Sequence, residues 1–214
     1  MYPLLFPLFS LLFLHSPGQP RYQKGFVVTA SGDTLRGQVY WKRNSTLNDR
    51  LFFLSAAGRE YQYEWKELRA ASSADDDQYM QVVTLRRALE YVEPRDYTIQ
   101  LQDSTAVQTL PLTRIYKGRR LSLYVYYEKA PFYFLYDGKN MIQLVQKYRY
   151  YSQVERLYDY EKGPRIHTTD LYKGVLSGYY EFDEDRKMRY LLENALYDER
   201  YLTVLIDKMN DRML

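Results

Sequence analysis

Apolar and polar side chains alternate along most of the chain from Gly25 to about Val145. Successive residues of a β-strand point to opposite faces of a sheet, so this alternation predicts strands that each bury one face. Turn residues divide the segment, most clearly at Ser31-Gly32-Asp33-Thr34, Ala57-Gly58-Arg59 and Asp137-Gly138. The pattern therefore predicts about nine or ten strands, joined mostly as hairpins.

Local residues also predict how the strands are connected. Gly32-Asp33 fits a two-residue hairpin loop with glycine first, because glycine accepts a positive φ. The small and acidic run from Ala70 to Gln78 is predicted to be a loop before a strand resumes at Met80. A further hairpin is expected between residues 97–102 and 105–110.

The period changes after Val145. Residues 148–168 show no settled periodicity and contain Gly163-Pro164, so they are predicted to be a connector. Apolar residues then recur at helical spacing in three segments, for which Thr169, Asp183 and Asp198 are the expected N-caps. Such apolar stripes must be buried against something.

The predicted fold class is therefore α+β. An antiparallel, hairpin-rich β-sheet or partly closed barrel is followed by about three C-terminal helices that cover one face or end of the sheet.

The first eighteen residues predict export. Leu4 to Leu14 is almost purely apolar, and no charged side chain precedes Arg21. The apolar run is too short to cross a bilayer as a helix, and small residues at Ser16-Pro17-Gly18 are typical of a signal-peptidase site. We expect cleavage after Gly18 and a periplasmic, outer-membrane-associated or extracellular protein.

The expected organisation follows from these segments. A signal peptide (1–18) precedes a β-rich domain (19–147), the connector (148–168) and a helical C-terminal part (169–214) that packs on the same domain. No membrane-spanning segment is expected in the mature chain.

Composition excludes several kinds of chemistry. The chain has no cysteine, so disulfides, thiolate metal sites, cysteine nucleophiles and lipidated cysteines are absent. The net charge is only +3 and the signs alternate along the chain, which argues against binding of nucleic acid. Tyrosine is abundant, with 25 residues against nine Phe, and suits half-buried positions in a sheet.

No residue set indicates catalysis, a metal or a cofactor. His167 is the one histidine of the mature chain, and a lone histidine cannot build a zinc site. Ser177 lies in a predicted helix and not in a nucleophile elbow. The adjacent carboxylates Asp75-Asp76-Asp77 lack the alternating ligand spacing of calcium loops, so we expect them to face water.

The candidate binding residues are Tyr148, Arg149, Tyr150 and Tyr151, where rings and a guanidinium concentrate outside the regular pattern. Such groups can stack on a ligand or a partner, although they can equally pack beneath the helices.

Several segments, in order, resemble one family. They are Gly25 to Gly37, Gly118 to Tyr124, Tyr133-Phe134, Asp170 to Leu176 and Tyr201 to Asn210. The chain resembles uncharacterised exported proteins of Bacteroidota that begin with a G-x-I-x-T-x-S-G-D-T-I-x-G hairpin. Those proteins often carry a cysteine after the first C-terminal helix, where this chain has Glu181-Phe182-Asp183. The resemblance implies a cell compartment and a fold, but no established activity.

Three hypotheses remain open. The first is a non-enzymatic exported module that binds a protein, peptide or envelope glycan. The second is a carboxylate-based hydrolase acting on polysaccharide, in which two acidic side chains act as acid and base. The third is a structural envelope component whose sheet edges pair with another sheet.

Overall fold

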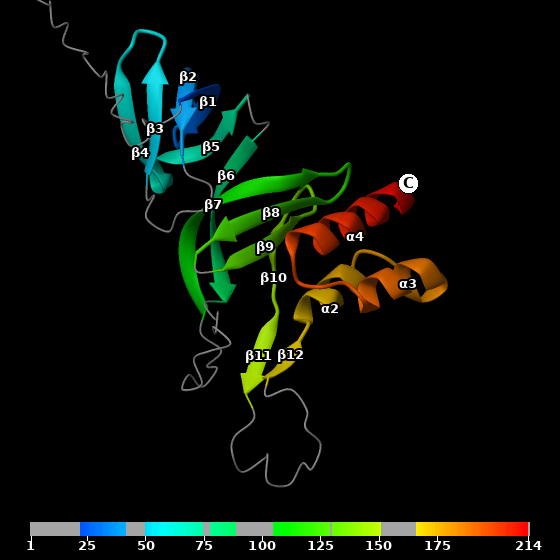
Figure 1. The fold of residues 1–214 in the computed structure, drawn as a ribbon. Helices are drawn as coiled ribbons and strands as arrows, with labels where there is room; N and C mark the ends of the chain where they lie inside the picture. Colours follow the sequence, from blue (N-terminus) through cyan, green and yellow to red (C-terminus); the bar gives the residue numbers. More distant parts are fainter. Residues whose placement is uncertain are drawn as a thin grey trace, which may run out of the picture.

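The computed structural model describes residues 22–41, 50–74, 78–88, 105–128, 130–150 and 166–213. Ten strands form one open antiparallel sheet, in the order β10-β9-β8-β7-β6-β5-β1-β2-β3-β4, and three α-helices follow them in the chain (Figure 1). This arrangement confirms the predicted α+β class. The strands of the sheet are β1 (Gln23–Thr29), β2 (Thr34–Tyr40), β3 (Arg50–Ser55), β4 (Glu60–Glu64), β5 (Leu68–Ser73), β6 (Gln78–Ala88), β7 (Thr105–Lys117), β8 (Ser122–Tyr127), β9 (Pro131–Tyr136) and β10 (Met141–Leu144).

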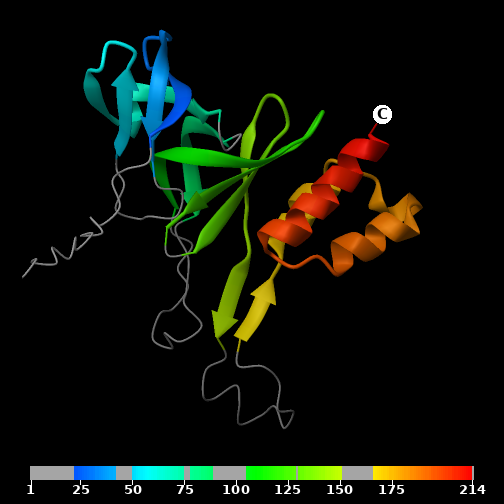
Figure 2. The ribbon, with the colours of Figure 1, turned by 45° about the horizontal axis from the view of Figure 1, so that its top comes forward.

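Two further strands, β11 (Lys147–Tyr150) and β12 (Ile166–Thr169), pair with each other as a separate antiparallel ribbon. They form the two ends of the segment expected to be a connector. The ribbon leads into α2 (Leu171–Ser177), α3 (Arg186–Glu193) and α4 (Glu199–Arg212). Figure 2 shows the three helices together on one side of β8, β9 and β10.

The first two hairpins use the same turn. The Gly32 N–H donates to the Thr29 carbonyl and the Thr29 N–H donates to the Asp33 carbonyl, which leaves a three-residue loop of residues 30–32. The predicted two-residue loop is therefore wrong, because Gly32 takes its positive φ (101°) at the third loop position. Gly58 has a φ of 75° in the equivalent turn, which joins β3 to β4.

Strand β5 corrects the prediction of a loop beginning at Ala70. It pairs with β1 on one side and β6 on the other, so it joins the two halves of the sheet. Small side chains are typical of loops, which is why the sequence pattern did not indicate a strand here. In the structure they permit close packing. Ala71 is fully buried, and a Cβ on Gly25 of β1 would lie 2.0 Å from the Ser72 carbonyl oxygen. Residues 75–77 and 97–102 lie outside the described residues.

The helix starts are set by acidic residues. Asp198 caps α4 as predicted, its carboxylate accepting from the Tyr201 N–H. The predicted cap Asp183 is wrong, because Asp185 caps α3 and Asp183 lies in a 3₁₀ turn, Phe182–Glu184. The predicted cap Thr169 is also displaced, since the residue before α2 is Asp170, which makes no side-chain capping bond.

The apolar side chains form three buried clusters. The largest lies between the helices and one face of β8, β9 and β10, and it includes Leu123, Leu135, Tyr172 and Met209. A second cluster lies within β1–β6. The third, called here the inner cluster, lies on the face of β7–β9 away from the helices and consists of Leu110, Leu112, Tyr124, Phe132 and Phe134.

Candidate functional site

The predicted binding residues fall partly outside what the structure describes. Tyr148, Arg149 and Tyr150 lie in β11, where Arg149 is opposite His167 of β12. Only their backbone is described, and Tyr151 lies outside the described residues. The structure therefore gives the strand on which this candidate lies, and its role in binding stays a prediction.

The other residues singled out from the sequence have structural surroundings. Ser177 ends α2, and its hydroxyl donates to the Lys173 carbonyl. The Asp183 carboxylate pairs with Arg189. Within the described residues, no group of three or more His, Asp or Glu side chains is placed to hold a metal ion.

A buried arginine is the most unusual feature of the sheet. Arg87, near the end of β6, has a side chain that is only 1% exposed and lies beside the inner cluster. Its guanidinium carbon is 4.8 Å from the ring centre of Phe132 and 5.3 Å from that of Tyr126. Aromatic faces attract a cation, and this attraction offsets part of the cost of removing the charge from water.

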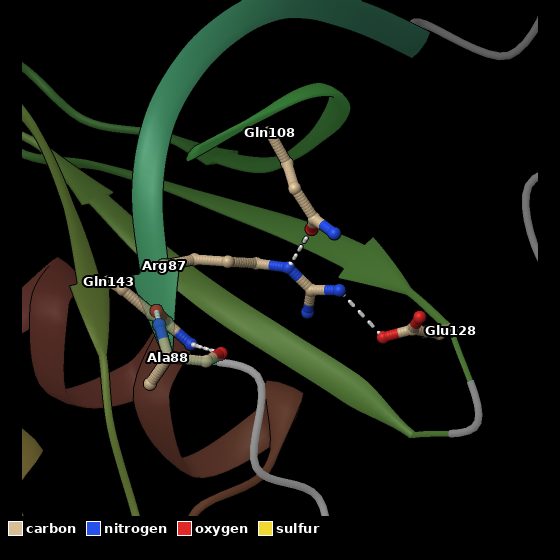
Figure 3. Close-up of polar contacts among 5 residues, drawn as sticks. All are labelled: Arg87, Ala88, Gln108, Glu128 and Gln143. Carbon is tan, nitrogen blue, oxygen red and sulfur yellow. Dashed lines mark hydrogen bonds and ion pairs between the residues drawn. The ribbon is translucent and has the colours of Figure 1, made fainter. Parts of the chain in front are cut away.

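Two polar side chains complete the described contacts of Arg87 (Figure 3). Its Nε donates to the Gln108 side-chain oxygen at 2.5 Å, and Nη2 donates to the Glu128 carboxylate at 2.8 Å. Glu128 is 43% exposed, so its charge stays partly hydrated while that of Arg87 does not. The third nitrogen, Nη1, is buried and has no hydrogen-bond partner among the described residues. A buried donor without an acceptor is costly, so this atom is a place where a ligand or water acceptor would be stabilised.

The neighbouring backbone has an unusual partner. The Gln143 side chain of β10 accepts from the Ala88 N–H at 2.8 Å and donates to the Ala88 carbonyl at 3.4 Å (Figure 3). Thus one side-chain amide occupies both backbone groups of a residue at the end of β6. Arg87 and Ala88 are adjacent in the sequence. The buried guanidinium of one and the backbone of the other, which is bound by the Gln143 amide, together are called here the Arg87 site.

A second candidate surface lies on β1–β4. Tyr22, Tyr40 and Phe52 form a row across the strands, called here the aromatic row, with successive ring centres 6.1 and 6.0 Å apart. The register places them on the face opposite the buried side chains of Val39 and Phe53. The rings are half-buried, and the exposed polar side chains around them are those of Arg36, Gln38, Arg50, Glu60 and Gln62.

A hydrogen bond connects the aromatic row to an edge strand of the sheet. The Tyr22 hydroxyl donates to the Glu60 carboxylate at 2.6 Å. Burial, with this hydrogen bond and the charge of Glu60, raises the pKa of Tyr22 to about 12. The hydroxyl therefore stays protonated at neutral pH and remains a donor. Strand β4, which carries Glu60, is an edge of the ten-stranded sheet.

Comparison with protein-family models, with curated proteins and with solved structures finds no match. No described helix has the length and apolar character needed to cross a membrane.

Neither candidate surface was identified from the sequence. Tyr40 lies in an alternating segment, but Phe52 lies in the apolar run Leu51 to Leu54, which does not indicate which residues face the core. The common face of the two rings follows only from the pairing of β2 with β3. Arg87 gave no such signal, because a single arginine at the end of a strand ordinarily faces solvent.

Proposed function

We propose that this protein is an exported, non-enzymatic binding module of the bacterial cell envelope, and that the face of β1–β4 bearing the aromatic row contacts another envelope protein. The supporting observation is the row itself: three half-buried rings, surrounded by exposed arginine and glutamine side chains, lie on a sheet face that no described helix covers. Tyrosine and arginine are enriched among residues that dominate the energy of protein interfaces.

The tilt of the rings favours a protein over a glycan. Tyr22 and Tyr40 are inclined by 53°, and Tyr40 and Phe52 by 45°. Rings inclined in this way present edges and corners, whereas the C–H face of a sugar ring stacks best on the exposed face of an aromatic ring. A partner side chain can fit between inclined rings while the surrounding amides and guanidinium groups form hydrogen bonds at the rim.

Two carboxyl groups, those of Asp137 and Glu64, are unsuited to the acid step of a hydrolase. A general acid of a glycosidase needs a raised pKa. The pKa values of Asp137 and Glu64 are both lowered. Hydrogen bonds donated by the Asn140 backbone and by Lys66, respectively, are the largest causes. Both shifts are opposite in sign to the one that acid catalysis requires.

The experiment is site-specific photo-crosslinking in a bacterial host that exports the full chain. A photoreactive phenylalanine replaces Gln62, which is exposed beside Phe52, and in a matched control it replaces Lys187, which is exposed on α3. We expect an envelope protein to be crosslinked from position 62 and not from position 187. The combined Tyr40→Ala and Phe52→Ala substitutions should remove that product.

Other results would contradict parts of the proposal. Equal products from positions 62 and 187 would show that this face is not the contact surface. Sedimentation of the mature protein with insoluble peptidoglycan, abolished by the same two substitutions, would indicate a glycan in place of a protein. An unprocessed chain in the cytosolic fraction would contradict export.

A further inference from the structure

Among the described strands, none pairs with one side of residues 82–88 of β6. Residues 78–81 pair with β5, while the described ladders pair residues 82–88 with β7 alone. Strand β10 is the other edge of the sheet and pairs with β9. The end of β6 and β10 approach each other, and Gln143 links them through Ala88. We call this place, between residues 82–88 and β10, the seam.

At the seam, the Gln143 side-chain amide makes the two hydrogen bonds that a residue of a neighbouring strand would make. In an antiparallel ladder, a residue of a hydrogen-bonded pair gives its N–H and receives at its carbonyl from the same opposite residue. Gln143 accepts from the Ala88 N–H and donates to the Ala88 carbonyl, so a side chain imitates one residue of an extended peptide. The backbone of a peptide can make the same two bonds and, unlike a single side chain, can continue the ladder along the strand.

Arg87 gives the seam a preference for a negatively charged ligand. Its Nη1 is buried without an acceptor among the described residues, one position away from Ala88. Arg86, the residue before it, is exposed on the opposite face of β6, where its Nη1 lies 3.4 Å from the Thr105 hydroxyl. This end of β6 therefore carries two arginines, one on each face, beside the partly hydrated carboxylate of Glu128. The excess of positive charge favours a carboxylate, and a guanidinium binds a carboxylate better than a neutral carbonyl.

We propose that the seam binds an extended acidic peptide segment of a partner protein. The peptide backbone displaces the Gln143 amide from Ala88 and moves β10 away from β6, because the two strands lie too close there for a third strand between them. An Asp or Glu side chain of the peptide, or its terminal carboxylate, accepts from Nη1 of Arg87. This is recognition by addition of a strand at an open edge, with the buried arginine setting the preference for acid. The seam lies in β6–β10 and is separate from the aromatic row on β1–β4, so different variants test the two proposals.

The test begins with a displayed library of random heptapeptides selected on the mature protein. We expect enrichment of alternating sequences that contain Asp or Glu. The enriched peptide is then synthesised in three forms: unchanged, with its acidic residue replaced by the corresponding amide, and with the backbone nitrogens around that residue methylated. Affinity is measured by fluorescence polarisation. The amide and methylated forms should each bind about tenfold more weakly or worse.

Variants of the protein locate the contact. Arg87→Lys keeps the charge but loses the planar fork, and should weaken binding about tenfold. Arg114→Lys is the matched control, because Arg114 also lies over an aromatic ring, that of Tyr79 at 4.6 Å, away from the seam. Gln143→Ala removes the competing amide and should strengthen binding, a gain that a purely structural role would not produce. If Arg87→Lys does not fold, the modified peptides and Gln143→Ala still decide the proposal.

Several outcomes would overturn it. Selection of neutral peptides, or undiminished binding by folded Arg87→Lys, would show that the buried nitrogen is served by water. Equal binding of the methylated peptide would exclude pairing at Ala88. If acetate alone displaced the peptide at equal concentration, the site would be one for small carboxylates and not for an extended segment.

Discussion

The Asn210 side chain binds both backbone groups of Leu121, a residue 89 positions earlier in the chain. Its oxygen accepts from the Leu121 N–H at 2.9 Å, and its nitrogen donates to the Leu121 carbonyl at 2.9 Å. The same oxygen also accepts from the Arg120 N–H. Helix α4 is thereby attached to the turn between β7 and β8. The geometry repeats that of Gln143 with Ala88, so in two places of the described structure a side-chain amide binds both backbone groups of one residue.

Replacing Asn210 by alanine should destabilise the fold by about 2–4 kcal/mol, because the buried backbone groups of Leu121 lose their partners. The measurement is urea unfolding followed by circular dichroism. Asn194→Ala is the control, since Asn194 is exposed and makes its side-chain bond to the Tyr190 carbonyl within the same helix end. A loss no greater in Asn210→Ala than in this control would contradict the role of Asn210 as an attachment.

Two glycine substitutions should have opposite effects. A Cβ at Gly25 would lie 2.0 Å from the Ser72 carbonyl oxygen and 2.8 Å from a methyl group of Val39. Since the carbonyl belongs to a paired strand, Gly25→Ala should cost at least about 2 kcal/mol. Gly174 lies within α2 with open space around it, so Gly174→Ala should add about 0.5–1 kcal/mol. The Tm of both variants, measured by thermal unfolding, tests the close packing of β5 against β1. Equal shifts in Tm for the two variants would contradict that packing.

Asp137 should make stability depend on pH in acid. Hydrogen bonds from the Asn140 and Lys139 backbones, and from the Tyr179 hydroxyl, lower the pKa of Asp137 to about 2. In the unfolded chain that pKa is about 4. A lowered pKa stabilises the fold fully above the unfolded value, and this contribution is lost as pH falls from about 4 through about 2.

The check is the difference in unfolding free energy between the natural chain and Asp137→Asn, measured from pH 6 to pH 2. The asparagine variant cannot ionise at this position, so the other carboxyl groups cancel in the difference. We expect the difference to be constant at the upper end and to shrink below pH 4. A difference that does not change with pH would show that Asp137 is not stabilised by these donors.

Tyr197 should matter through its hydroxyl. This group donates to the Leu144 carbonyl at 2.5 Å and accepts from the Tyr133 N–H at 3.3 Å, so it bridges two residues that lie opposite each other on β10 and β9. Tyr197→Phe keeps the ring and removes both bonds, so it should cost about 1–2 kcal/mol. Tyr190→Phe, at a position 65% exposed, should change stability by less than about 0.5 kcal/mol. Equal urea midpoints for the two variants would contradict this account.

The alternation of side chains and the helical stripes were sufficient to predict an antiparallel sheet followed by three helices. Both are local patterns, because the side-chain period of a strand or helix can be recognised from residues that are neighbours in the sequence. The cap at Asp198 was equally local. Predictions failed where a short interval admitted several geometries. Gly32 could take its positive φ in loops of two or three residues, and Asp183 and Asp185 both offered a carboxylate before α3.

By itself, the sequence determined the fold class, the positions of most strands and the abundance of half-buried tyrosine. Only the tertiary structure decided that the small residues of β5 form a central strand, that Arg87 is buried over the rings of Tyr126 and Phe132, and that Gln143 pairs with Ala88. The physical reason is that these features depend on partners far away in the chain: 55 positions separate Gln143 from Ala88, and 41 separate Arg87 from Glu128. The local side-chain period of a segment does not indicate which distant residues that segment will contact in the folded chain.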